Sequence, residues 1–215
     1  MPAIALVAGA GGRLGESLLN RVLASGDYAA VVGLARAPMT LGVRGLVLAP
    51  SEALPPIDDV FLNLAPPGAQ PASFHGRDAV WASVDADRVL PVVRAACAAG
   101  ARRLVLLTPT PVWQQMGGMH RGLAGERERA LAALPLTSLT ILRPIVESAG
   151  GARGWVERVA AIYTSLQRLA MPRSMPVHTS EQLARCALAA MRGARDGVRV
   201  VAADKIPELL REASS

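Results

Sequence analysis

Residues 4–15, Ile4-Ala5-Leu6-Val7-Ala8-Gly9-Ala10-Gly11-Gly12-Arg13-Leu14-Gly15, decide the fold of this chain. The first five are apolar without alternation, which predicts a strand buried on both faces. Gly9, Gly12 and Gly15 follow in the spacing G-x-x-G-x-x-G, and a helix-period segment begins at Leu14. A buried strand that passes through a glycine-rich turn into a helix predicts the start of a β-α-β unit.

Apolar runs and helix-period segments alternate along the rest of the chain. We expect strands at residues 4–8, 30–34, 45–48, 59–64, 103–107, 139–142 and 198–201. We expect helices at residues 14–23, 78–99, 123–134, 155–169, 181–191 and 205–212. This rhythm predicts an α/β fold with a doubly wound, mostly parallel sheet and helices on both faces. We expect one domain over residues 1–215, with a core at 1–145 and a small C-terminal helical and strand extension at 146–215.

Composition narrows the classes of function. The net charge is +6, but the basic residues are scattered and aromatic residues make up only 3%, so we expect no nucleic-acid partner. No apolar run is long enough to span a membrane and no signal peptide is evident, which predicts a cytoplasmic protein without a membrane partner. Cys97 and Cys186 lie in apolar helical stretches without metal-ligand spacing, so no metal site is expected.

The glycine loop suits the pyrophosphate of a dinucleotide. Such a group needs a tight turn, a backbone without Cβ atoms and a helix N-terminus that attracts negative charge. The residues predicted to hold the cofactor there are Gly9, Gly11, Gly12, Arg13, Leu14 and Gly15. The alternative is a tight strand-to-helix turn without a ligand.

The end of the second expected strand indicates which dinucleotide is bound. An NAD site usually has an acidic residue here to accept the ribose hydroxyls, whereas this chain has Arg36. A guanidinium can pair with the 2′-phosphate of NADP(H), and Arg13 is close enough in sequence to assist. We therefore expect NADP(H) to be preferred over NAD(H). The alternative is that Arg36 is a solvated surface residue.

The glycine spacing, Arg36 and the order of later segments resemble the atypical short-chain dehydrogenase/reductases, a group in the NAD(P)-binding Rossmann superfamily. The small members similar to the Tat-interacting oxidoreductase are the nearest in pattern. The later segments are Val84-Asp85-Ala86-Asp87-Arg88-Val89-Leu90, Gly100-Ala101-Arg102-Arg103-Leu104-Val105, Leu142-Arg143-Pro144, and Val177-His178 followed by Leu183-Ala184-Arg185.

The resemblance implies further residues near a cofactor. It implies that Leu64, Ala65 and Pro66 run beside the adenosine and pyrophosphate. It also implies that Thr108, Pro144 and Ile145 approach the nicotinamide. The alternative for Pro144 is that it only ends a strand.

The catalytic pattern of the resembled family is absent. Its members usually carry a Tyr with a Lys four residues later, because the ammonium group lowers the pKa of the phenol. Here Tyr28 and Tyr163 are the two tyrosines, Lys205 is the sole lysine, and no such pair can form. His120 falls in the tyrosine's place, and Thr108 or Thr110 in the place of the usual serine.

Two functional hypotheses remain open. In the first, the chain is an NADPH-dependent reductase of a small carbonyl compound, with His120 as proton donor and Thr108 orienting the carbonyl oxygen. In the second, it binds NADP(H) without reduction chemistry and acts as a sensor or regulatory protein. Its small-molecule or protein partner and its oligomeric state stay open at this point.

Overall fold

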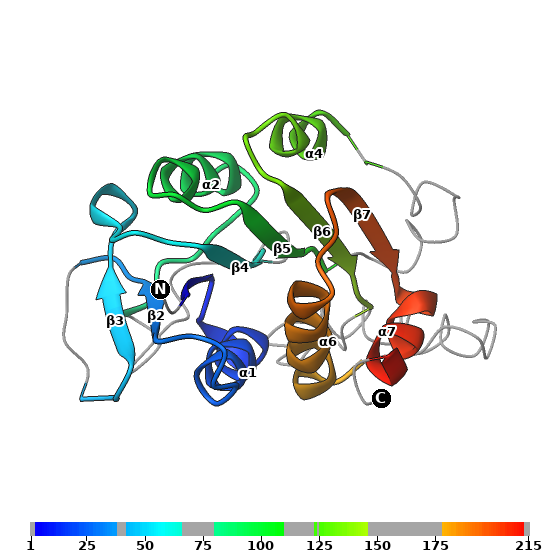
Figure 1. Cartoon of the computed structure of the whole chain (residues 1–215), viewed down its shortest axis with the longest axis horizontal. Coiled ribbons are helices and arrows are strands. Elements are labelled where there is room, and N and C mark those ends of the chain that lie inside the picture. The colour runs from blue at the N-terminus through cyan, green and yellow to red at the C-terminus, as the bar shows by residue number, and fades with distance from the viewer. Residues whose placement is uncertain are drawn as a thin grey trace, which may run out of the picture.

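A computed structural model describes residues 3–37, 42–65, 80–109, 123, 125–145 and 178–212. Seven strands form one sheet in the order β3-β2-β1-β4-β5-β6-β7, and every neighbouring pair is parallel (Figure 1). The strands are β1 (Ile4–Ala8), β2 (Ala30–Leu34), β3 (Leu46–Ala49), β4 (Asp59–Asn63), β5 (Arg103–Leu107), β6 (Ser138–Arg143) and β7 (Gly197–Ala202). The prediction of a doubly wound parallel sheet is confirmed.

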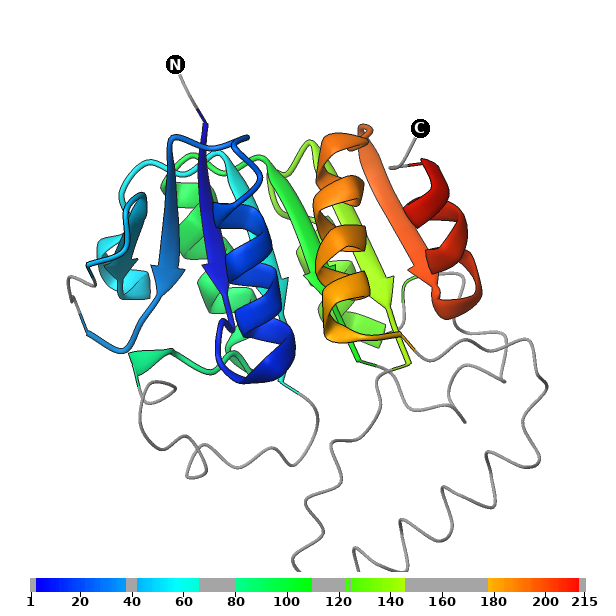
Figure 2. The same cartoon turned by 90° about the horizontal axis from the view of Figure 1, so that it is seen from below.

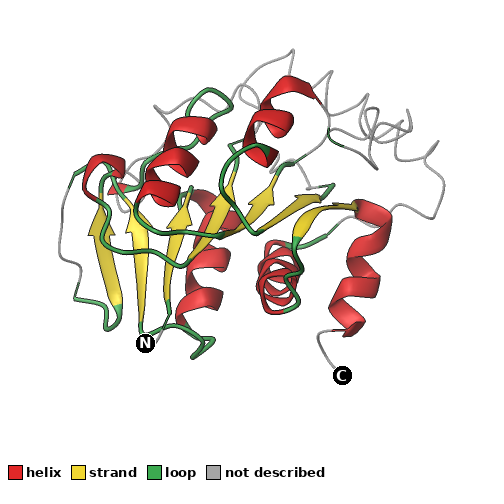
Figure 3. Cartoon of the chain, turned by 45° about the horizontal axis from the view of Figure 1, so that its top comes forward, coloured by secondary structure: helices red, strands yellow, loops and turns green. Residues whose placement is uncertain are grey.

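Helices cover both faces of the sheet (Figure 3). One face carries α1 (Gly12–Leu23), α6 (Ser180–Arg192) and α7 (Ile206–Glu212), and the other carries α2 (Val89–Ala98) and α4 (Gly125–Ala132). Two 3-10 turns, η1 (Ser51–Ala53) and η5 (Ala203–Lys205), follow β3 and β7. No helix in these described ranges is long and apolar enough to cross a membrane.

The continuous apolar runs of the sequence are explained by two cores, one on each side of the sheet. In β1, Ala5 and Val7 belong to the cluster that includes α1 and α6, whereas Leu6 and Ala8 belong to the cluster that includes α2. All four side chains are fully buried. A strand with both faces covered has no position for a polar residue, so period-two alternation is lost.

Residues 180–212 are built into the sheet layers. β7 pairs with β6 from Ser138↔Gly197 to Arg143↔Ala202, and α6 packs against α1. Thr179 caps α6 through a reciprocal pair of hydrogen bonds with Gln182. This part of the predicted C-terminal extension therefore contributes a strand and a covering helix to the main fold. The helix expected at 155–169 lies outside the described residues.

The long helix predicted at 78–99 is wrong in its first half, because α2 begins only at Val89. Residues 80–84, called the strap below, instead lie across strand ends. The Ala82 amide donates to the Leu34 carbonyl, the Arg36 amide donates to the Val80 carbonyl, and the Ala65 amide donates to the Val84 carbonyl. These partners are distant in sequence, so a local pattern does not reveal them. Pro91 also fits this shorter helix, since proline is tolerated in a first turn but not in an interior.

The strap packs closely on β2. A Cβ atom at Gly33 would lie 2.5 Å from Cζ3 of Trp81 and 2.9 Å from Cδ2 of Leu48. The indole therefore rests where a side chain of β2 would otherwise stand. Glycine at this position lets the strap approach the strand.

Candidate functional site

The predicted binding residues gather where the parallel strands end. All seven strands point the same way, so their carboxyl ends share one edge of the sheet (Figure 2). The chain winds from β1 through β2 to β3 on one side, and β4 to β7 continue on the other side. The change of direction between β1 and β4 is the place where open α/β sheets form a ligand crevice.

The three glycines of the G-x-x-G-x-x-G spacing each have their own structural reason. Gly9 has φ +75° and a Cβ there would collide with the Asn63 carbonyl, so the turn passes directly over the end of β4. A Cβ at Gly15 would collide with the Gly9 carbonyl, so α1 begins in close contact with the loop. Gly12 has φ +71° with open space where its Cβ would stand. The loop is therefore closely packed against other backbone at Gly9 and Gly15, and it is open on the side where a Cβ of Gly12 would stand.

The start of α1 has no negative group of its own. Its N-cap residue Gly11 supplies no side-chain hydrogen bond, and the first turn contains no acidic residue. The first turn holds Arg13, which is exposed and has no ion-pair partner among the described residues, and Leu14, which is half-buried. Free amide groups, the helix dipole and a nearby guanidinium together favour an anion at this position.

Asn63, the last residue of β4, is a residue of the site that the sequence patterns above do not single out. Its Nδ2 donates to the Gly9 carbonyl over 3.2 Å, which ties the glycine loop to the end of β4. Its Oδ1 is buried and has no hydrogen-bond partner among the described residues. A polar residue closing the apolar run Val60-Phe61-Leu62 was the available signal in the sequence.

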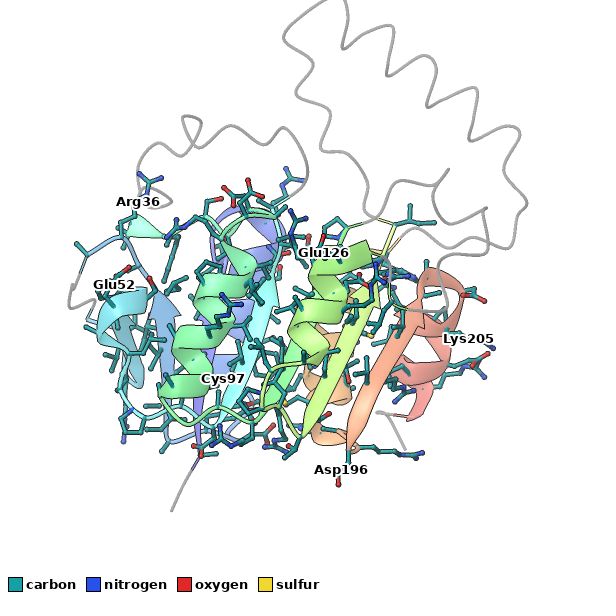
Figure 4. All side chains as sticks on the ribbon, turned by 90° about the horizontal axis from the view of Figure 1, so that it is seen from above. Arg36, Glu52, Cys97, Glu126, Asp196 and Lys205 are labelled. Carbon is teal, nitrogen blue, oxygen red and sulfur yellow. The ribbon has the colours of Figure 1, made fainter. Side chains whose placement is uncertain are left out.

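Arg36 lies just past the end of β2 and lines a cavity of about 160 Å³. Its side chain is exposed and has no hydrogen-bond or ion-pair partner within the described ranges. Figure 4 shows it at the same edge as Glu126, while Asp196 lies at the opposite edge. The other residues lining the cavity come from β2, η1, the strap and the start of α2: Leu34, Ala35, Pro50, Ser51, Glu52, Ala82 and Arg88.

The residues implied by the family resemblance also lie at this edge where they are described. Leu64 and Ala65 follow β4 and are half-buried, and their amides donate to the carbonyls of Leu107 and Val84. Thr108 follows β5, and its amide donates to the Leu142 carbonyl over 2.8 Å. Pro66 and His120 lie outside the described residues. The binding and catalytic roles of all these residues stay predictions.

The end of β6 is held by buried polar contacts. Pro144 and Ile145 are buried there, and the Ile145 carbonyl accepts from the amide of His178. The His178 ring is itself buried, with Nε2 3.1 Å from the Ala203 carbonyl, and burial lowers its pKa. This imidazole therefore favours its neutral form and joins the ends of β6 and β7 to the start of α6.

An ion pair holds α4 against β6 close to the same edge. The Arg143 guanidinium donates to the Glu128 carboxylate over 2.6 Å, and the two side chains are only 4% and 11% exposed. A charged pair so far from solvent requires both partners, because either charge alone would be poorly solvated.

Tyr28 and Lys205 lie at opposite edges of the sheet. Tyr28 precedes β2 at the amino edge and donates to the Asp59 carboxylate over 2.8 Å. Burial and the Asp59 charge raise the pKa of this phenol, so it does not ionise readily. Lys205 follows β7, across the sheet from Arg36 (Figure 4), and pairs with Glu208. Tyr28 and Lys205 are therefore not neighbours and form no Tyr-Lys pair.

Other reactive groups give no second centre in the described ranges. The thiols of Cys97 and Cys186 are buried, and burial raises the pKa of the Cys186 thiol to about 12. No group of three His, Cys, Asp or Glu side chains there could hold a metal ion.

Comparisons with known proteins agree on the fold. No protein-family model matches the sequence, and no curated protein matches it either. Among solved structures, an oxidoreductase of the short-chain dehydrogenase/reductase family from Burkholderia thailandensis is similar with a TM-score of 0.58 and 15% identity, over 97% of this chain and 94% of that one.

Two similar structures contain a bound dinucleotide. A short-chain dehydrogenase/reductase superfamily protein from Agrobacterium tumefaciens with bound NAD has a TM-score of 0.56 and 18% identity, over 97% of this chain and 81% of that one. MoeE5 in complex with UDP-glucose and NAD has a TM-score of 0.54 and 17% identity, over 98% and 81% of the two chains. The chain therefore has the Rossmann-type α/β fold of short-chain dehydrogenase/reductase structures.

Proposed function

We propose that this chain is an NADP(H)-binding protein of the atypical short-chain dehydrogenase/reductase type. The observation that carries the proposal is the glycine loop, which is tight beneath Gly9 and Gly15 and open above Gly12. A pyrophosphate needs this combination, because its oxygens must approach backbone amides without meeting a Cβ atom. The bound NAD of two similar structures supports a nicotinamide dinucleotide as the ligand class.

The described residues fit such a ligand. The loop and the start of α1 would hold the pyrophosphate, with Arg13 adding positive charge. Leu64 and Ala65 would run beside the adenosine half, while Thr108, Pro144 and Ile145 would lie toward the nicotinamide. When bound, a nicotinamide dinucleotide supplies or accepts a hydride.

The preference for NADP(H) rests on Arg36. This residue follows β2 and lines a cavity, and its guanidinium has no hydrogen-bond or ion-pair partner in the described ranges. An NAD site would place a carboxylate near this position to accept the ribose hydroxyls, whereas a guanidinium suits a phosphate.

Two activities are consistent with such a site. One is reduction of a small carbonyl compound, with Thr108 orienting the carbonyl oxygen and His120 providing the proton. The other is sensing or structural use of NADP(H) without turnover. The second is favoured by the absence of any Tyr-Lys pair in the sequence and by the position of Tyr28 at the amino edge of the sheet.

Calorimetric titration with NADPH and NADH tests the binding proposal. We expect NADPH to bind more tightly, and Arg36→Ala to weaken NADPH binding about 10- to 100-fold with little change for NADH. Arg44→Ala is the matched control, because it removes the same charge from an exposed site at the other end of the neighbouring strand β3. Equal affinities of the unmodified protein for the two cofactors would show that the NADP(H) preference is wrong.

A second variant tests the loop itself. Gly12→Val should abolish binding of both cofactors, because the isopropyl group would occupy the open space above the turn. Circular dichroism must show that the variant is folded. A folded Gly12→Val protein with unchanged affinity would contradict the assignment of the pyrophosphate to this loop.

NADPH consumption over a panel of small aldehydes and ketones separates the two activities. Turnover that is lost in His120→Ala, with NADPH affinity kept, supports the reductase with His120 as proton donor. Turnover that survives in His120→Ala shows that the proton comes from elsewhere. Tight NADPH binding without turnover on any compound favours the sensor.

A further inference from the structure

Two arginines from different elements line the cavity at the end of β2. Arg36 follows the strand, and Arg88 lies at the start of α2. The cavity of about 160 Å³ has the volume of about five water molecules, which is enough for one phosphate group. Guanidinium groups are the side chains best suited to a phosphate, because each can donate two parallel hydrogen bonds.

The Arg88 side chain is held in place before any ligand binds. Its Nη1 donates to the Ser83 carbonyl over 3.0 Å, so the side chain folds back along the strap. Its backbone amide donates to the Asp85 carboxylate over 2.9 Å, which fixes the turn that leads into α2. A cation that is already positioned loses less side-chain entropy when it contacts an anion.

The negative charge at the start of α2 comes from Asp85, whose carboxylate accepts from the amides of Asp87 and Arg88, and the Arg88 side chain adds nothing favourable there. Arg88 is the N-cap residue of α2, makes no side-chain cap and is followed by no acidic residue in the first turn. A positive charge at a helix N-terminus is opposed by the helix dipole. The stability of α2 therefore gives no reason for an arginine at this position.

One carboxylate shares the cavity with the two arginines. Glu52 accepts a hydrogen bond from the Ser51 hydroxyl over 2.7 Å, and this bond, aided by the charge of Arg88, lowers its pKa. The cavity therefore carries two positive charges and one negative charge at neutral pH. Glu52 would repel a phosphate group that binds between the arginines.

We propose that Arg88 is the second cation of a 2′-phosphate subsite formed with Arg36, and that Glu52 limits how tightly this subsite binds. This inference rests on the proposed function, because it assigns a residue to the recognition of NADP(H). In this proposal Arg88 strengthens the preference for NADP(H) over NAD(H), and Glu52 weakens it.

Binding of adenosine 2′,5′-bisphosphate and adenosine 5′-monophosphate, measured by calorimetry, isolates the subsite from the nicotinamide half. Arg88→Gln should weaken the bisphosphate about 10- to 100-fold and leave the monophosphate within about twofold. Arg94→Gln is the matched control, since it removes an exposed arginine from the same helix away from the cavity. Glu52→Gln should tighten the bisphosphate several-fold, because the amide keeps its shape without its charge.

Thermal unfolding separates recognition from structure. Arg88→Gln should leave the melting temperature unchanged or slightly raised, because a cation leaves the N-terminus of α2. Weakening of both nucleotides to the same extent, or no weakening of either, would overturn the assignment of Arg88. Failure of the unmodified protein to prefer NADPH would refute the proposed function itself, whereas a preference that depends on Arg36 but not on Arg88 would refute this inference alone.

Discussion

Replacing Arg143 by methionine should lower the free energy of unfolding by about 3–5 kcal/mol. The residue's guanidinium donates to Glu128 over 2.6 Å, and the two side chains are 4% and 11% exposed. Methionine fills similar space but leaves the buried carboxylate without this partner, which is the costly half of breaking a buried pair. For a domain of this length the loss corresponds to a melting temperature lowered by about 6–20 °C.

Urea unfolding followed by circular dichroism measures this effect, and two further variants identify its cause. The double variant Arg143→Met with Glu128→Met should recover most of the loss, since two apolar side chains of similar volume can replace a buried pair. Arg127→Met, on the same helix as Glu128, is the matched control, because its ion pair with Asp87 is 50% and 94% exposed and should contribute less than about 1 kcal/mol.

Two results would refute the assignment of a stabilising role to the buried pair between Arg143 and Glu128. A loss below about 1 kcal/mol in Arg143→Met would mean that the pair behaves like a surface ion pair despite its burial. A double variant as unstable as the sum of the two single variants would mean that the two residues act independently. Either result would remove the argument that this pair fixes α4 to the end of β6.

Three further outcomes follow from other parts of the fold. Gly15→Ala should lower the free energy of unfolding more than Gly12→Ala, because its methyl group would collide with the Gly9 carbonyl whereas at Gly12 only the positive φ opposes a side chain; urea unfolding of both variants checks this order. His178 has a lowered pKa, so the unfolded chain takes up a proton below about pH 6.5 that the folded chain resists, and stability should fall as the pH drops. Urea unfolding at pH 5.5 and 7.5 should therefore show a smaller difference in His178→Gln than in the unmodified protein. Tyr28→Phe removes a hydroxyl donor from a fully buried carboxylate and should lower the free energy of unfolding by about 1–3 kcal/mol in the same urea assay.

The sequence predicts the sheet well because most inner strands contain a run of at least three consecutive apolar residues, whereas β6 is interrupted by the buried Thr140. The bounds of β1, β2 and β5 agree with the predicted residues. Each of the other strands differs from its prediction by one residue, at one end or at both ends. A strand of this kind can be predicted from its own residues alone, because burial of both faces requires consecutive apolar side chains. The parallel order follows from the helices between them.

Long-range contacts account for what the sequence did not reveal. The strap looked helical because residues 78–88 carry no proline or glycine break, but its backbone bonds to the ends of β2 and β4. The places of Asn63 and Arg88 cannot be predicted from the sequence for the same reason, because one contacts the Gly9 carbonyl and the other lines a cavity shared with Arg36. Their neighbours in space are far from them in the chain.

The contact between the strap and β2 has a consequence for how this sequence can vary. Trp81 occupies the space beside Gly33, so a larger residue in the strand requires a smaller one in the strap. Substitution of either position alone opens a void or creates a clash next to Arg36, whereas a paired exchange keeps the volume. Among related chains, the residues at positions 33 and 81 should therefore change together. Chains that keep the glycine and the tryptophan should also keep the cavity beside Arg36.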